Sequence, residues 1–388
     1  MRLIRIREVT VCAAVMAAVA VSGVAMAGTG FDRFERPRHY DPPGLTVTAM
    51  AVGDVNRDGR SDVVVGMDGR GQTSVLLAGR AGRLSAPRPL GFTGSGGVAI
   101  ADVNGDGNRD IVRVSLDTWR LNEPDESEHV VFFGNGRGGF GTRAVTRTKC
   151  CANDVAVADF NRDQKSDLAV AGVGVLLGDG TGRFPIVRAI ETGYSTAVAD
   201  LNRDGKLDLV VLNQDEDPDP AIVLLGDGTG GFGPRRQLAA DDVASVAVGR
   251  FNRDRWPDLA TVSFSDSGRD VRVLLGRRDG HPRATRRYNV GRSPIDVEVA
   301  DLNRDYKDDL VVSGYSDLEG RAGAVRVLYG AGRGRFRRPR QVAACCNGPL
   351  NVGDFNGDRK PDLATTLTRT PNGSSFDRVS ILMNATRR

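Results

Sequence analysis

Residues 200–208, "DLNRDGKLD", place three carboxylates and one amide within nine positions. Asp200, Asn202, Asp204 and Asp208 occupy positions 1, 3, 5 and 9, and a looped backbone would turn these side chains inward, with the carbonyl of position 7 beside them. Hard oxygen ligands in this number, on a flexible loop, are the ligands that Ca²⁺ prefers. Without a cation these carboxylates would repel one another, so the spacing predicts a calcium-binding loop.

The pattern recurs seven times, beginning at residues 54, 102, 159, 200, 250, 301 and 354. Solvated Asp/Asn turns would explain one copy but not seven in register. An EF-hand is excluded because the flanks read as strands and position 12 lacks the bidentate Glu. We predict that Ca²⁺ binds six copies through the following residues: Asp54, Asn56, Asp58, Arg60 (carbonyl) and Asp62; Asp102, Asn104, Asp106, Asn108 (carbonyl) and Asp110; Asp159, Asn161, Asp163, Lys165 (carbonyl) and Asp167; Asp200, Asn202, Asp204, Lys206 (carbonyl) and Asp208; Asp301, Asn303, Asp305, Lys307 (carbonyl) and Asp309; Asp354, Asn356, Asp358, Lys360 (carbonyl) and Asp362.

The copies differ at positions 1 and 6. Gly59, Gly107 and Gly205 occupy position 6, where the turn requires a left-handed residue. Gln164, Tyr306 and Arg359 replace this glycine at a strain of roughly 1 kcal/mol each. The fifth copy begins with Arg250, so it loses a ligand and gains a positive charge; we expect it to be metal-free, with Arg250 paired to Asp254 or Asp258.

The segments around each loop define the fold. A short alternating run precedes each copy, a β-branched run follows its last Asp, and two further runs come later, with glycines usually between them. Four short strands per repeat of about 50 residues predict an all-β, seven-bladed β-propeller of four-stranded antiparallel blades. The last blade has three strands near the chain end, and "FERPRHY" (34–40) is similar to "FRRPRQV" (336–342). We therefore expect residues 31–41 to pair with 379–384 and complete blade seven.

With these loops and repeats the chain resembles the FG-GAP-like or VCBS repeat propellers, which are related in architecture to the integrin α-subunit head. The resemblance covers nearly all of residues 28–388. It rests on the seven D-x-N-x-D-x-x-x-D loops, and a literal Phe-Gly…Gly-Ala-Pro motif is absent. An integrin-like role in cell adhesion is what the resemblance implies.

Residues 1–27 read as a secretory signal, with a basic start, an apolar run from Val9 to Val24 and a small-x-small cleavage site at Ala25–Ala27. The run of about 16 residues is short for a membrane span. We expect residues 28–388 to form a single exported domain without a membrane span, secreted, periplasmic or held at the cell surface, and monomeric. Cleavage removes three Arg and Glu8, so the net charge of +4 falls to +2, and the Arg residues are scattered along the sequence. This balance argues against a nucleic-acid partner.

The connections between the second and third strands vary in length, and several are acidic, as in 115–129 and 213–221. Variable loops on a rigid scaffold commonly form binding surfaces. We therefore predict that an extracellular glycan or protein binds the face formed by these connections. The alternative is that the connections vary only because insertions there are tolerated. A polysaccharide lyase or glycoside hydrolase acting from the same face is the alternative function. Its carboxylates would come from the following residues: Glu123, Asp125, Glu126, Asp215 and Glu216. The three His residues, His39, His129 and His281, lie in no nucleophile motif, and we favour a protein that is not an enzyme.

Two adjacent cysteine pairs lie shortly before the calcium loops of blades three and seven: Cys150–Cys151 and Cys345–Cys346. Disulfides are expected in an exported chain. Because these blades lie nearly opposite each other, a cross-link between the pairs is disfavoured, and each pair is predicted to form a vicinal disulfide. A flat, rigid vicinal disulfide could serve as a plate for a sugar or an apolar group.

Overall fold

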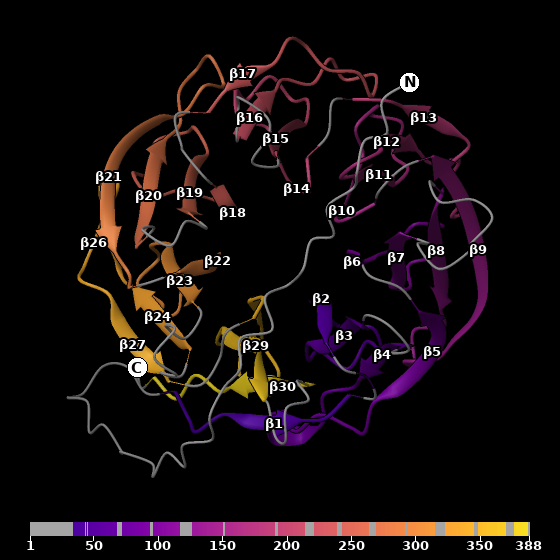
Figure 1. Cartoon of the computed structure of the whole chain (residues 1–388), viewed down its shortest axis with the longest axis horizontal. Coiled ribbons are helices and arrows are strands. Elements are labelled where there is room, and N and C mark those ends of the chain that lie inside the picture. Colours follow the sequence, from indigo (N-terminus) through magenta and orange to yellow (C-terminus); the bar gives the residue numbers. More distant parts are fainter. Residues whose placement is uncertain are drawn as a thin grey trace, which may run out of the picture.

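The computed structural model forms a closed ring of β-sheets around a central channel (Figure 1). It describes residues 34–42, 44, 46–67, 72–93, 96–116, 126–149, 152–190, 193–213, 221–238, 243–263, 269–291, 293–314, 323–344, 348–369 and 376–386. All statements about structure below concern these residues.

Seven four-stranded antiparallel blades make the ring, as the repeats predicted. Blade one contains β2 (Val47–Gly53), β3 (Asp62–Met67), β4 (Gln72–Leu76) and β5 (Arg88–Thr93); blade two β6 (Val98–Ala101), β7 (Asp110–Leu116), β8 (Glu126–Gly134) and β9 (Phe140–Lys149); blade three β10 (Val155–Ala158), β11 (Asp167–Val170), β12 (Gly174–Leu177) and β13 (Ile186–Arg188); blade four β14 (Ser195–Ala199), β15 (Asp208–Leu212), β16 (Ala221–Leu224) and β17 (Arg236–Gln237); blade five β18 (Val243–Gly249), β19 (Asp258–Ser263), β20 (Asp270–Leu275) and β21 (Arg283–Asn289); blade six β22 (Pro294–Ala300), β23 (Asp309–Gly314), β24 (Ala324–Leu328) and β27 (Arg340–Ala343); blade seven β28 (Asn351–Gly353), β29 (Asp362–Arg369), β30 (Phe376–Leu382) and β1 (Arg38–Tyr40).

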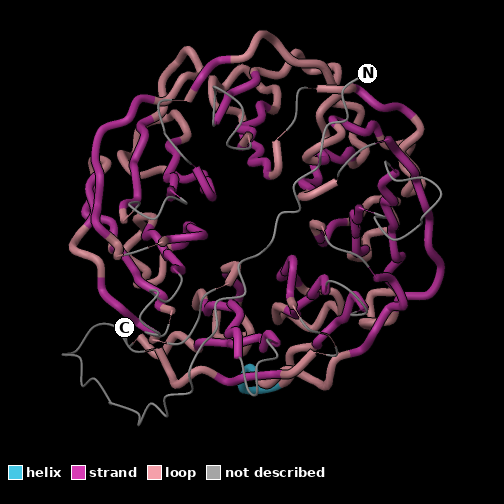
Figure 2. Tube along the Cα trace, viewed as in Figure 1, coloured by secondary structure: helices cyan, strands magenta, loops and turns pink. Residues whose placement is uncertain are grey.

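Two smaller elements accompany the blades. A two-stranded ribbon, β25 (Gly330–Gly332) with β26 (Arg335–Phe336), forms the connection between the third and fourth strands of blade six. One short 3₁₀ turn, Arg80–Gly82, is the helical segment of the described chain and lies near β1 (Figure 2). No described helix has the length and apolar character that crossing a membrane requires.

The core lies between the blades. The second strand of each blade carries β-branched and Leu side chains that are buried on both faces, as in β3 and β15. These side chains form seven apolar clusters, one at each junction between neighbouring blades. Each sheet is therefore covered by two neighbours, which holds the first strands at a fixed distance around the channel.

The ring closes between the two ends of the described chain, as expected. Arg38, His39 and Tyr40 of β1 pair antiparallel with Ile381, Ser380 and Val379 of β30. Phe34 forms a bridge to Asn384, so the pairing extends along the predicted segment from residue 34, while residues 31–33 lie outside the described chain. The junction is sealed by the cluster that joins blades seven and one.

Candidate calcium-binding loops

Each acidic loop connects the first and second strands of one blade, with position 9 as the first residue of the second strand. Positions 3 and 5 have the same role in all seven loops. The Asn Oδ1 of position 3 accepts the amide of position 5 at 2.8–3.0 Å. The Asp Oδ1 of position 5 accepts the amide of position 7 at 2.7–3.0 Å. These turns are specified locally, because Asn and Asp readily hydrogen-bond to the backbone two residues later.

The carboxylate at position 1 sets six loops apart from the seventh. Its Oδ2 accepts the amide of position 6 at 2.6–3.0 Å in the loops that begin at residues 54, 102, 159, 200, 301 and 354. Position 6 has a positive φ in each of these six loops, including Gln164 (67°), Tyr306 (60°) and Arg359 (62°). The left-handed conformation inferred from the glycines is therefore confirmed, and the side chains at Gln164, Tyr306 and Arg359 adopt it under strain.

The fifth loop departs from this geometry. Arg250 offers no carboxylate, and Arg255 at position 6 is absent from the residues with positive φ. The expected pairing of Arg250 with Asp254 or Asp258 is wrong: neither ion pair forms, because Asp258 is fully buried and occupied by backbone amides, and Asp254 caps its own turn. The backbone amide of Arg250 donates instead to Asp308 of blade six at 2.6 Å.

Position 4 also adopts a positive φ in all seven loops, which the sequence analysis did not single out. Four of its Arg side chains reach the carbonyl of position 6 in the loop of the next blade. These bonds run from Arg57 to Gly107, from Arg203 to Arg255, from Arg253 to Tyr306 and from Arg304 to Arg359. The recurring "NRD" was the signal that could have revealed this link between loops.

Basic residues at position 7 pair with the carboxylate at position 5. Lys307 Nζ lies 2.6 Å from Asp305, Lys360 lies 3.2 Å from Asp358, and Lys206 lies 3.7 Å from Asp204. Arg60 and Lys165 pair with their loops' Asp in the same way. Positive charge thus already compensates one carboxylate in five loops.

Position 9 is buried in every loop. The exposed fraction of all seven Asp side chains is 0%: Asp62, Asp110, Asp167, Asp208, Asp258, Asp309 and Asp362. One oxygen accepts the amide of position 2 at 2.6–3.1 Å. The other accepts an amide from the end of the third strand or from the segment just after it at 2.7–2.9 Å. Each carboxylate therefore joins the acidic loop to the outer half of its own blade.

Glycine permits this contact in the middle blades. The amide donor to Asp208 is Gly226, where a Cβ would lie 2.1 Å from the carbonyl oxygen of Leu207. Gly134, Gly178, Gly276 and Gly330 are equally close to the residue at position 8 of their own loops. The glycines that end the third strand are thus required by packing, as their hairpin context suggested.

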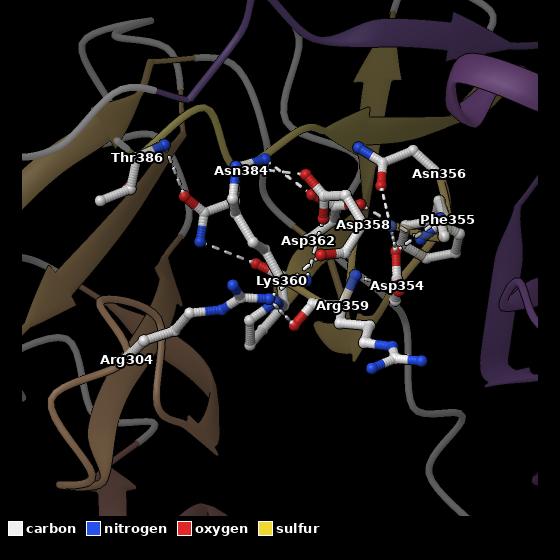
Figure 3. Close-up of polar contacts among 12 residues, drawn as sticks. Arg304, Asp354, Phe355, Asn356, Asp358, Arg359, Lys360, Asp362, Asn384 and Thr386 are labelled. Atoms are coloured by element: carbon white, nitrogen blue, oxygen red, sulfur yellow. Dashed lines mark hydrogen bonds and ion pairs between the residues drawn. The ribbon is translucent and has the colours of Figure 1, made fainter. Parts of the chain in front are cut away.

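Figure 3 shows this arrangement in blade seven. Asp354, Asn356 and Asp358 surround the turn, and Asp362 lies behind them, where it receives the amide of Asn384 at 2.7 Å. Arg304 approaches from blade six. Burial raises the pKa of Asp362 to about 7 against the lowering effect of its two backbone hydrogen bonds, and burial raises the pKa of Asp309 likewise to about 7.

The donor chemistry of the six loops suits Ca²⁺, since positions 1, 3, 5 and 9 all present oxygen. In the described chain, however, no three His, Cys, Asp or Glu side chains converge closely enough to hold a metal ion. In five of the six loops the position 5 carboxylate faces a basic side chain, and in all six the position 9 carboxylate faces backbone amides. Calcium binding would therefore require position 5 to exchange its cationic partner for the metal.

A second concentration of carboxylates lies in the central channel. Residues in or just before the first strand of each of the seven blades line a cavity of about 610 Å³. Asp154 accepts Ser195 Oγ at 2.8 Å from the next blade. Asp296 accepts Ser245 Oγ at 2.6 Å and the amide of Leu350 at 2.7 Å, so it joins blades five, six and seven. Burial, with the charge of Asp296, raises the pKa of the half-buried Glu298 to about 8.

Several predicted features lie outside the described residues. They are both cysteine pairs, the carboxylates of Glu123, Asp125, Asp215 and Glu216, and the side chain of Glu126. The vicinal disulfides and the variable binding face stay predictions. Of the histidines, His129 is 1% exposed and binds Thr148 at 2.7 Å, and burial lowers its pKa to about 4, which suits a core residue.

Seven blades with an acidic loop between the first and second strand of each define a β-propeller of the repeat type. A sequence model described as the FG-GAP-like repeat matches residues 54–113, 200–261 and 250–312. The chain is accordingly a seven-bladed propeller that contains FG-GAP-like repeats. No curated protein matches the sequence.

Solved structures share the fold at low identity. The crystal structure of BBS1N in complex with ARL6DN, soaked with mercury, is similar with a TM-score of 0.58 and 12% identity, covering 92% of this chain and 98% of that chain. The same complex soaked with lead gives a TM-score of 0.59 and 13% identity over 91% and 96% of the two chains. The exotype rhamnogalacturonan lyase YesX gives 0.51 and 13% over 88% and 75%. These likenesses concern the fold alone.

Proposed function

We propose that this protein is an exported, calcium-stabilised propeller that binds a carbohydrate or a protein through one face. The observation that carries the calcium half is the shared geometry of six loops, in which the position 1 carboxylate caps the amide of position 6. The loop that lacks this carboxylate also lacks the geometry. A repeated calcium site requires the same turn in every copy, and these six loops also repeat the oxygen ligands at positions 1, 3, 5 and 9.

The proposal that the protein binds a carbohydrate or a protein is supported by the rigid scaffold of the blades. Adjacent blades bury their second strands completely and leave the connections free to vary, which is how rigid folds support binding loops. BBS1N is crystallised with a protein partner, and YesX is described as a lyase of rhamnogalacturonan. Both are compatible with a propeller that presents one face to another molecule.

A glycan array with purified residues 28–388, run with calcium and again with chelator, tests both halves. We expect binding of one glycan class that weakens on chelation. Product analysis of each positive glycan separates a binding module from the alternative, a polysaccharide lyase or hydrolase, since cleaved products would establish the enzyme. An array without positive glycans, together with no protein captured on the immobilised domain, would refute the binding role.

A further inference from the structure

Two Arg-rich segments belong to neighbouring blades. Residues 276–290 and 330–343 contain ten Arg and a single acidic residue, Asp279. The second segment begins 40 positions after the first ends, so in the sequence alone the Arg residues look scattered. In the ring they become adjacent.

The outer strands of blades five and six bring these segments together. The amide of Phe336 donates to Tyr288 Oη at 2.9 Å, and the two rings lie 5.7 Å apart in an edge-to-face contact. Figure 1 shows β21, β26 and β27 following one another along the rim. We call this surface the basic edge, and its ten exposed Arg residues are Arg277, Arg278, Arg283, Arg286, Arg287, Arg333, Arg335, Arg337, Arg338 and Arg340.

The basic edge continues onto the face that carries the acidic loops. Gly334 donates to the carbonyl of Phe251 in the fifth loop at 2.8 Å. In that loop Arg253 reaches the carbonyl of Tyr306 at 3.1 Å, and Arg255 lies 5.8 Å from the ring of Trp256. The fifth loop, which has lost its calcium ligand to Arg250, thus adds positive charge to the same region.

Tyr306 is the exposed aromatic of this region. Its exposed fraction is 89%, against 45–49% for the other exposed large apolar side chains, and its φ is +60° where three sister loops have glycine. The ring of Tyr306 is exposed to solvent and therefore does not contribute to the core, and the backbone of Tyr306 is strained. Strained residues often belong to functional sites.

We infer that the basic edge, with Tyr306, binds an acidic polysaccharide. Guanidinium groups bind carboxylate and sulfate groups through paired hydrogen bonds, and an exposed aromatic face can cover the apolar face of a sugar ring. The described part of this surface carries one exposed ring, that of Tyr306, whereas single-stranded nucleic acid is usually held by several stacking rings. This inference goes beyond the proposed function: it names one ligand class and assigns it to the rim and the face of the acidic loops, whereas the proposed function relies on the varying connections between the second and third strands.

The test compares two variants with the same change in charge. In the first, Arg283, Arg286, Arg287, Arg337 and Arg338 are replaced by Gln. In the matched control, Gln replaces five exposed Arg of other blades: Arg80, Arg83, Arg88, Arg183 and Arg188. Polygalacturonate, dextran sulfate, neutral dextran and a DNA duplex serve as probes at several salt concentrations, with calcium constant.

We expect at least one acidic polysaccharide to bind, and the edge variant to lose about tenfold or more in affinity, with a shallower salt dependence. The control should stay within about threefold of the wild type, since its charges lie elsewhere. The carboxylated and sulfated probes decide which anion the edge prefers. Tyr306→Gly restores the residue that sister loops use, so it should fold well and yet weaken polysaccharide binding without changing the salt dependence.

Three results would overturn the inference. They are equal losses in edge and control variants, tighter binding of DNA than of either polysaccharide, and no binding of any acidic probe. In the last case, a positive neutral glycan or protein partner would leave the proposed function intact and remove only the basic edge. Without any partner, both would fail.

Discussion

At the scale of single residues, Asp has two distinct roles within one nine-residue loop. The carboxylates at positions 1 and 5 lie at the surface and cap local amides, as Asp200 and Asp204 do. The carboxylate at position 9, for example Asp208, is fully buried and joins two segments of its blade. In the predicted calcium loops a metal would bind both groups, while the second group also stabilises the blade through its hydrogen bonds to backbone amides.

The first prediction separates a calcium loop from the fifth loop by changing the same position in each. Ca²⁺ that binds only the native state raises the melting temperature according to RT ln(1 + [Ca]/Kd). Asp204→Ala should therefore reduce the rise in melting temperature on calcium addition, and Asp254→Ala should leave it unchanged. Thermal unfolding with calcium and with chelator measures both. Equal effects of the two substitutions, or indifference of the wild type to chelator, would refute the calcium assignment.

The second prediction isolates the buried carboxylate where no metal is expected. Asp258 accepts the amides of Phe251, Asn252 and Gly276 at 2.6, 3.2 and 2.8 Å. Asp258→Ala leaves these donors without a partner, so the free energy of unfolding should fall by about 3 kcal/mol or more. Urea unfolding should give the same loss with calcium and with chelator. A loss confined to calcium-containing buffer would show that the fifth loop binds metal after all.

Much of this residue-level detail could be predicted. The glycines at position 6 predicted a left-handed backbone conformation there, because few other residues adopt that conformation freely. The positive φ of the Arg residues at position 4 and their hydrogen bonds to the next loop could not be predicted from the sequence, because both depend on how neighbouring blades are placed. The second partner of position 9 lies 11–24 residues later in the first six loops and could not be read from the loop itself.

At the scale of elements, each blade repeats one plan, and blade seven completes it with a strand from the other end of the described chain. β1 contributes three ladder pairs, an ion pair from Asp41 to Arg378 and the packing of Tyr40 against the cluster between blades seven and one. The missing fourth strand of the last blade and the likeness of "FERPRHY" to the outer strand of blade six were sufficient to predict this closure. The varying connections between second and third strands have no such repeat, so sequence reasoning could only mark them as variable.

The third prediction tests the closing strand. Deletion of residues 28–41 should lower the melting temperature strongly and promote aggregation, since it exposes the edge of β30. Deletion of residues 28–33 alone is the control and should have little effect, because all the described pairs with β30 and Asn384 lie at Phe34 and beyond. Differential scanning calorimetry and light scattering measure the two outcomes. Similar melting of the two truncated proteins would mean that β1 contributes nothing to closure.

At the scale of the whole molecule, charge is separated from the centre to the rim. Carboxylates of Asp154, Asp296 and Glu298 face the channel, and Arg side chains cover the outer strands of blades five and six. Neither group stood out in the sequence, because the channel acids alternate with apolar residues on ordinary strands and the Arg residues belong to different repeats. Only the ring brings each group together.

The fourth prediction concerns the pH dependence of stability that Glu298 contributes. Its folded pKa, about 8, lies above the ordinary 4.5, because burial and the neighbouring Asp296 disfavour the charged form; Asp154 acts on Asp296 from across the channel. Its contribution is therefore complete below about pH 4.5 and is lost as the pH rises through 8. Glu298→Gln should match the wild type near pH 5 and exceed its free energy of unfolding by about 1–2 kcal/mol near pH 9. If the difference in free energy of unfolding between Glu298→Gln and the wild type were the same at both pH values, the effect would come from packing and not from titration of Glu298.

The closing strand has a consequence for the order of events during synthesis. His39 is made long before its partner Ser380, 341 residues later, which at ribosomal rates corresponds to roughly half a minute. Throughout that time the first strand has no sheet to join, and six blades can assemble as an open arc with two unsatisfied ends. Completion of the ring is then a single late event that locks all earlier blades at once. A chain interrupted before β30 should accordingly be a substrate for proteases and chaperones, whatever the stability of its individual blades.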